Sequence, residues 1–398
     1  MSERAPKFTP YSGEGESGFG EIKSVEKAEQ ISASVLGVLQ EQRELNTFDD
    51  VATNPNAWLV FSAEFDQKMK NEMDGQPESH SDHFVNAVYQ MQKTKAIEQY
   101  LYQAKIKGVE TILKGDYFEQ LRLICSAKAE QSIVTALFRA GDNTDVRKEI
   151  VALFTAVGAT KWGGDIEDNL QRLCSGAELE KEEHQEALGL MRGVTGHVAA
   201  IDILHKIFNS ETYSPSVEID GRHGIDIGAR SFNDEDSSVA MAVQVKARNM
   251  LENVGGVLLT AVSANADERI GFVEKVDKSR LTPDERIGHE RELAIGKLQG
   301  GMFWLKKQKM ESVDEENLVG VLMELRSSQY GRVFDVADSQ EGYFDISTGV
   351  CNYALLEEVY RQGEGLLQEI AQMREKARSI YQGSLRIHRD KRGKVGAV

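Results

Sequence analysis

The feature that most constrains the fold is a pair of alternating segments in the second half of the chain. GIDIGARSF (224–232) and VAMAVQVKAR (239–248) are separated by the short acidic stretch NDEDSS (233–238). In both segments, apolar residues alternate with small or polar ones, which is the period of two that a β-strand imposes. The pattern therefore predicts two strands joined by a turn, each with one face turned toward a core.

The other face of this hairpin collects polar groups beside residues with little or no side chain. Asp226 shares its face with two glycines, while Gln244 and Lys246 share theirs with two alanines. If the hairpin is regular, the turn places Asp226 nearly opposite Gln244. Opposed side chains have Cβ atoms about 4.5–5.5 Å apart, and a diagonal neighbour such as Lys246 lies at about 7–8 Å. The three side chains are therefore expected to converge, unless a bulge shifts the register by one residue.

These residue types suit a hard divalent cation. Mg²⁺ prefers oxygen ligands, often one or two carboxylates completed by waters and phosphate oxygens. A bound metal of this kind acidifies water and neutralises charge at a phosphorus centre. A nearby lysine can orient the attacking water or stabilise the transition state. The hairpin thus predicts a site for Mg²⁺ or Mn²⁺.

The flanking segments predict a mixed α/β layer. Residues 193–209 have helical periodicity, 215–220 alternate like a strand, and 317–325 are apolar enough for a buried strand. A long helix is expected over 289–310. From 193 to 325 the expected order is helix, three strands, an insertion, a helix and a strand, which is a mixed α/β arrangement.

An Asp in one strand followed by Q-x-K in the next, after a helix and a strand, resembles the restriction-endonuclease-like PD-(D/E)xK nuclease superfamily, in its Mrr-like Q-x-K branch. The matching pieces are Gly224-Ile225-Asp226 and Gln244-Val245-Lys246. The resemblance implies an αβββαβ core within 191–350. It also implies that Asp226 and Gln244 bind metal and that Lys246 is catalytic.

Many members of that family carry a further metal-binding Glu on the preceding helix, and TGHVAAIDILHKIF (195–208) contains none. His197 lies near the expected place and Asp202 is the only carboxylate in this stretch, so both are candidate metal ligands. Glu218 or Asp220 on the predicted first strand are further candidates. A degenerate, non-catalytic domain is the remaining alternative.

The rest of the chain is expected to form three further parts. Residues 1–22 have the composition of a disordered segment, 23–190 read as a helical bundle suited to scaffolding or partner contact, and 351–398 as a long helix with a basic tail. The apolar stripe of that last helix is either intramolecular core or a homo-oligomer seam. In PESHSDHF (77–84), His80 and His83 are interpreted as a polar loop ending in a helix cap, with half a metal site as the alternative.

Composition narrows the partners and the compartment. The formal net charge of −17 argues against a large sequence-independent nucleic-acid surface but leaves room for a small local site. Three scattered cysteines fit a reducing compartment, and no signal segment or membrane span is recognised in the sequence, so a cytoplasmic protein is expected.

Two functions remain open from the sequence. The first is a metal-dependent nuclease, acting on DNA in defence or nucleic-acid processing. The second is a non-enzymatic helical interaction protein with a degenerate nuclease-like domain. A nucleotide-cofactor enzyme has little support, because no phosphate-binding loop follows a predicted strand.

Overall fold

The computed structural model describes residues 8–10, 80–106, 116–159, 181–232, 238–248, 258–262, 281–307, 318–328 and 342–352. Within these residues the protein has the mixed α/β architecture that the sequence predicts. Its helices are α4 (His80–Ile106), α5 (Asp116–Arg139), α6 (Thr144–Ala159), α8 (Lys181–Phe208), α9 (Val217–His223) and α10 (Pro283–Lys307). Its strands are β1 (Phe8–Pro10), β2 (Ser210–Pro215), β3 (Ile227–Phe232), β4 (Ser238–Arg248), β5 (Leu258–Val262) and β6 (Leu318–Arg326).

The strands form one mixed sheet in the order β1-β2-β3-β4-β6-β5. β3 and β4 are the antiparallel hairpin expected from the alternating segments. β6 pairs parallel with β4, and the chain reaches it through α10. β5 comes from the stretch treated as an insertion and pairs antiparallel with β6 at the sheet edge.

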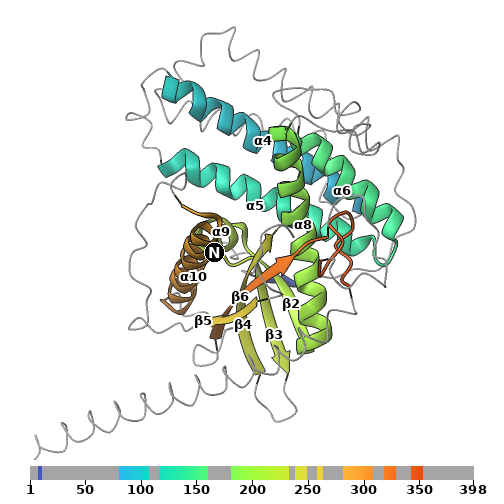
Figure 1. The fold of residues 1–398 in the computed structure, drawn as a ribbon, viewed down its shortest axis with the longest axis vertical. Helices are drawn as coiled ribbons and strands as arrows, with labels where there is room; N and C mark the ends of the chain where they lie inside the picture. The colour runs from blue at the N-terminus through green and yellow to red at the C-terminus, as the bar shows by residue number, and fades with distance from the viewer. Residues whose placement is uncertain are drawn as a thin grey trace, which may run out of the picture.

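Helices cover both faces of the sheet, with α8 on one side and α10 on the other (Figure 1). Because successive side chains of a strand point to opposite faces of the sheet, the hydrophobic core is divided into two clusters, one on each face. Val243 and Val321 belong to the cluster that includes α8, whereas Ala242 and Leu322 belong to the cluster that includes α10. The sheet is therefore the middle of three layers.

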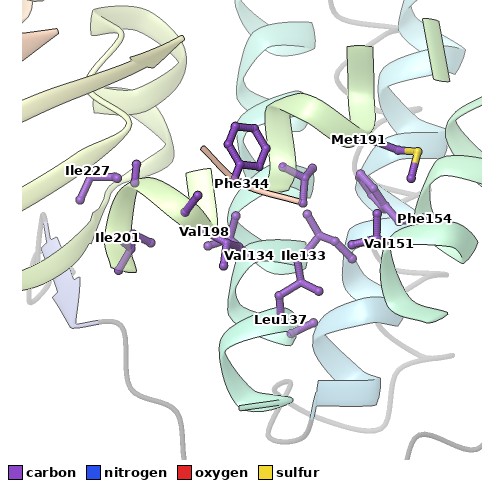
Figure 2. Close-up of a cluster of buried hydrophobic side chains, with 14 of the residues drawn as sticks. Ile133, Val134, Leu137, Val151, Phe154, Met191, Val198, Ile201, Ile227 and Phe344 are labelled. Carbon is purple, nitrogen blue, oxygen red and sulfur yellow. The ribbon is translucent and has the colours of Figure 1, made fainter. Parts of the chain in front are cut away.

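The cluster on the α8 side continues without a break into the helices α4, α5 and α6. Figure 2 shows side chains of α5, α6 and α8 meeting Ile227 of β3 and Phe344 from the segment after β6. α8 also runs through position 190, where the sequence suggests a domain boundary. The helical region and the sheet thus share one hydrophobic core among the described residues.

The predicted strand at 215–220 is wrong. The strand β2 ends at Pro215, and 217–223 form the two-turn helix α9. Ser216 stands at the N-cap in an extended conformation, and Gly224 ends the helix with φ 61°, a left-handed conformation that glycine adopts at low cost. The apolar residues Val217 and Ile219 alternate like a strand, but a helix this short cannot be distinguished by periodicity.

Other segments predicted from the sequence agree with the structure to different degrees. Helical periodicity in the sequence covers 95–114, 117–140 and 146–159. α5 and α6 begin and end within two residues of the last two ranges, whereas α4 already starts at His80 and α8 starts far before residue 193. In the segment predicted to be disordered, residues 8–10 form β1 beside β2. The predicted terminal helix (352–382) and basic tail lie almost wholly outside the described residues.

One stretch of the described residues, Gln185–Lys206 of α8, is long and apolar enough to cross a membrane by composition. The sequence had suggested no such stretch. In the fold, 67% of this stretch is buried, and the stretch lies between the helical region and the sheet. Burial of this kind is what a core helix of the three-layer arrangement requires, so the composition of α8 is explained by packing.

Candidate functional site

The predicted register of the hairpin is confirmed. Ile227 pairs with Val243, so the next positions outward are Asp226 and Gln244. The backbone N–H of Asp226 donates to the Val243 carbonyl oxygen at 2.9 Å, and the backbone N–H of Val245 donates to Asp226 Oδ2 at 2.7 Å. The Asp226 carboxylate is therefore fixed against the edge of β4, directly beside Gln244.

The turn after α9 explains why Asp226 arrives at this place. Gly224 reverses the chain in a left-handed conformation, and its N–H donates to the Asp220 carbonyl oxygen at 2.9 Å. A Cβ at Gly224 would lie 3.0 Å from Gln244 Nε2, so a glycine here gives the amide room. Gly301 of α10 lets that helix approach the end of α9, because a Cβ there would meet the His223 carbonyl oxygen at 2.7 Å.

Gln244 is one of several described residues with a buried side-chain polar atom that has no hydrogen-bond partner. It is 2% exposed, and its Oε1 atom has no hydrogen-bond partner among the described residues. A buried acceptor without a partner costs about 1–3 kcal/mol, so it is rare in a side chain that has only a structural role. By register Gln244 is opposite Asp226, so a cation bound between the two strands could be shared by the amide oxygen and the carboxylate.

A carboxylate that the sequence did not single out joins this group. Glu130 of α5 lies near Asp226 and Lys246. Its negative charge raises the pKa of Asp226, and the positive charge of Lys246 lowers the pKa of Glu130. His197 Nδ1, on α8, lies 3.2 Å from Glu130 Oε1. His197 thus contacts Glu130, a carboxylate that comes from a helix much earlier in the chain.

Close packing of α5 on α9 brings Glu130 to this position. Gly221 of α9 lies against the α5 backbone, since a Cβ there would be 3.2 Å from the Leu123 carbonyl oxygen. Gln131, next to Glu130, donates from Nε2 to Asp220 Oδ2 at 2.8 Å and to the Pro215 carbonyl oxygen at 3.1 Å. Figure 1 shows α9 lying between α5 and α10.

The carboxylates of the site affect each other's protonation. Burial raises the pKa of Asp226, and the negative charge of Glu130 raises it further, against the opposing effects of Lys246, His197 and the Val245 N–H. Burial also opposes ionisation of Glu130. The hydrogen bond from His197 and the charges of His197, Lys246 and Lys297 outweigh it, so the pKa of Glu130 lies below its usual value.

Asp220 is the third carboxylate of the group. Burial raises its pKa well above the usual value, and the charges of Asp226 and Glu130 add to that effect. The hydrogen bond from Gln131 and the charge of Lys297 oppose it. Burial and repulsion between the carboxylates therefore both favour the protonated form of Asp220.

One other sequence candidate does not join this group. Asp202 lies on the side of α8 near α6, where its charge neighbours are Arg147, Lys206 and His205. Burial raises the pKa of Asp202. The side chain of Glu218 lies outside the described residues, as do those of His80 and Asp82 in the histidine segment.

Among the described side chains, no group of three or more His, Cys, Asp or Glu residues is arranged to hold a metal ion. A cation at this site would therefore need the amide oxygen of Gln244 besides Asp226 and Glu130. Mg²⁺ is compatible with such a set, because it keeps several waters and takes one or two carboxylates together with substrate oxygens. This donor set suits a cation because the Oε1 atom of Gln244 is buried and has no hydrogen-bond partner among the described residues.

A signal for Glu130 does exist in the sequence. Glu130 stands four residues before Val134 and three before Ile133, both fully buried. A carboxylate on the apolar stripe of a helix must be paired or functional, because burying a lone charge is costly. The sequence does not say which distant element the carboxylate meets.

A scan against protein-family models, a search of curated proteins and a search of solved structures find no match to this chain.

Proposed function

We propose that this protein is a metal-dependent nuclease that hydrolyses phosphodiester bonds, with DNA as the expected substrate. The observation that carries the proposal is the buried, unpartnered Oε1 of Gln244 beside the Asp226 carboxylate. The order of elements from α8 to β6 supports a restriction-endonuclease-like core, in which β3 and β4 carry these residues. The resemblance seen in the sequence supplies the reaction class.

The proposed role of each site residue follows from the chemistry of its side chain. Asp226, Glu130 and the amide oxygen of Gln244 would hold Mg²⁺ or Mn²⁺, which when bound supplies an acidified water and neutralises charge at phosphorus. Lys246 acts as a positive charge near both carboxylates, as their pKa shifts indicate. In this role its ammonium donates to a phosphate oxygen and stabilises charge that develops there.

The positioning groups are less exposed to substrate. His197 holds Glu130 through the contact of Nδ1 with Oε1. The Val245 N–H holds one oxygen of Asp226. Both contacts restrict the carboxylates to one orientation, which lowers the cost of arranging them when a cation binds.

The test is cleavage of plasmid and linear DNA by the full-length chain with Mg²⁺, with Mn²⁺ and with EDTA. Cleavage is expected only with metal. Asp226→Asn and Lys246→Ala are each expected to lower the rate about a hundredfold or more, because each removes a charge from the reacting centre. Glu130→Gln is expected to weaken Mn²⁺ binding measured by calorimetry, a readout that does not depend on turnover.

Lys148→Ala provides the control, because Lys148 is an exposed cation on α6, and it should leave cleavage unchanged. Metal-dependent cleavage that survives both Asp226→Asn and Lys246→Ala would come from a contaminant and would remove the proposal. DNA binding without any cleavage would instead favour the alternative, an interaction protein with a degenerate nuclease-like domain.

A further inference from the structure

A second lysine reaches the candidate site from a helix that packs on the sheet. Lys297 belongs to α10, and its aliphatic stem crosses the turn between α9 and β3. A Cβ at Gly224 would lie 2.7 Å from Lys297 Cδ and 2.9 Å from Cε, so only a glycine leaves this path open. The same Cβ would lie 3.0 Å from Gln244 Nε2, which places the lysine stem and the Gln244 amide around one point.

Lys297 is an exposed residue, although its stem packs over Gly224. Long basic side chains commonly cover a surface with their methylene groups while the ammonium stays in water. The ammonium is therefore available to a ligand that approaches from solvent. It also lies near Glu130 and Asp220, since its charge lowers the pKa of both carboxylates.

Lys246 and Lys297 thus bracket the carboxylates from two different layers of the fold. Lys246 comes from the sheet and acts on Asp226 and Glu130, while Lys297 comes from α10 and acts on Asp220 and Glu130. A chain with a net charge of −17 repels a polyanion, so cations set at the site must attract it locally. A lysine ammonium is a compact point charge that suits a phosphate oxygen.

We propose that Lys297 binds a phosphate of the nucleic-acid backbone beside the bond that is cut, and so sets substrate affinity rather than the chemical step. This assignment rests on the proposed nuclease function. Lys246 then acts on the reacting phosphate and Lys297 on its neighbour. The opposing explanation is that Lys297 only offsets the carboxylate charges of the folded protein.

The experiment compares Lys297→Met, Lys297→Arg and Lys148→Ala with the unchanged full-length chain. Methionine keeps the stem over Gly224 and removes the charge, so folding should be retained. Binding of a fluorescent DNA duplex is measured with Ca²⁺ in place of Mg²⁺, over a series of salt concentrations, and cleavage is measured separately with Mg²⁺. Urea unfolding of each variant reports its stability.

Lys297→Met is expected to weaken duplex binding about tenfold, as loss of one charged hydrogen bond does. It should also lower the slope of log affinity against log salt by about 0.9, the value for one phosphate contact. The kcat should stay within about twofold, because the contact is equal in ground and transition states. Lys297→Arg should restore most of the affinity, and Lys148→Ala should change nothing.

If the chain cleaves DNA but Lys297→Met changes neither the affinity for the duplex nor the salt slope, the assignment is overturned and the nuclease proposal stands. A loss of stability in Lys297→Met with unchanged duplex affinity would show the opposing, structural role. If the unchanged chain neither binds nor cleaves a DNA or RNA duplex, the nuclease proposal and the assignment both fall.

Discussion

The two faces of the sheet are built by the same strands but hold different kinds of side chain. On the α8 face, Val243 and its neighbours belong to an apolar core that extends through the helical region. On the α10 face the apolar cluster includes Ala242 and Leu322, but the next inward position on β4 is Gln244, followed by Lys246. The α8 face is apolar along β4, whereas the α10 face combines an apolar cluster with polar side chains at the end of β4.

The α10 face also shows how this protein satisfies a buried charge when the charge is structural. Glu324 of β6 is 2% exposed and accepts hydrogen bonds from Arg248 at 2.7 and 2.9 Å and from Arg291 at 2.6 Å. Every part of that carboxylate is paired. Gln244, two positions before Lys246 on the same face, keeps an acceptor without a partner. On this face of the sheet, the paired Glu324 has a structural explanation, whereas the unpaired Oε1 of Gln244 does not.

The largest expected effect lies on the apolar face. Phe344 is fully buried in the cluster that joins sheet and helices. Phe344→Ala should lower the free energy of unfolding by about 3–5 kcal/mol, since it removes an aromatic side chain and leaves a cavity. Urea unfolding measures it, with Leu293→Ala on the exposed side of α10 as control, expected within about 0.5 kcal/mol. Equal losses in the two variants would show that Phe344 is not a core residue.

Two glycines of α8 lie on different sides of the helix: Gly196 faces the sheet, and Gly193 does not. A Cβ at Gly196 would lie 2.6 Å from Ala247 Cβ and 3.3 Å from Phe344 Cζ, whereas a Cβ at Gly193 would meet nothing within 4 Å. Gly196→Ala should lower the free energy of unfolding by about 1–3 kcal/mol through overpacking. Gly193→Ala should raise it by about 0.5–1 kcal/mol, because alanine is the better helix former. The same sign for both would contradict the contact of α8 with β4.

The helical region on the apolar side also contains a largely buried amine. Lys95 of α4 donates to the Val157 carbonyl oxygen at 3.0 Å, and burial lowers its pKa to about 8, against the charges of Glu186 and Glu98. In the unfolded chain the amine keeps its proton up to about pH 10.4. Between these values only the unfolded state binds the proton, so stability should rise with pH by up to about 1.4 kcal/mol per unit.

Lys95→Met removes that group, so the rise with pH above about 8 should be absent from the variant. The measurement is the difference in unfolding free energy between the variant and the unchanged chain from pH 7 to 10. The advantage of the variant should be greatest below pH 8 and should shrink above it. A difference independent of pH would mean that Lys95 stays charged in the folded protein.

The part of the site that depends on local pattern was predictable from the sequence. Strand alternation and the length of the turn fix the register, which is why Asp226 and Gln244 fall opposite each other. The helix α9 was not predictable in this way. Its two turns are too few to establish a helical period, and the helix is defined by its two ends, Ser216 and Gly224.

Glu130 marks the limit of such inference. Its position next to the apolar side of α5 signals a carboxylate that needs a partner, but its neighbours His197 and Asp226 come from elements far along the chain. Only the packing of α5 against α8 and α9 brings the three together. A search confined to the helix before the hairpin finds His197 and Asp202, and of these the fold brings only His197 to Glu130.

A modest expected change in stability, at Gln244, distinguishes the two faces most directly. Gln244→Met keeps the length of the side chain and removes the unpartnered oxygen, so the free energy of unfolding should rise by about 1 kcal/mol. The same variant should lose Mn²⁺ binding and metal-dependent cleavage, because one oxygen of the donor set is gone. A gain in stability joined to a loss of function is expected where a strained polar group is kept for its chemistry. If Gln244→Met instead lowers stability, Oε1 has a structural partner, and the contrast with the fully paired Glu324 disappears.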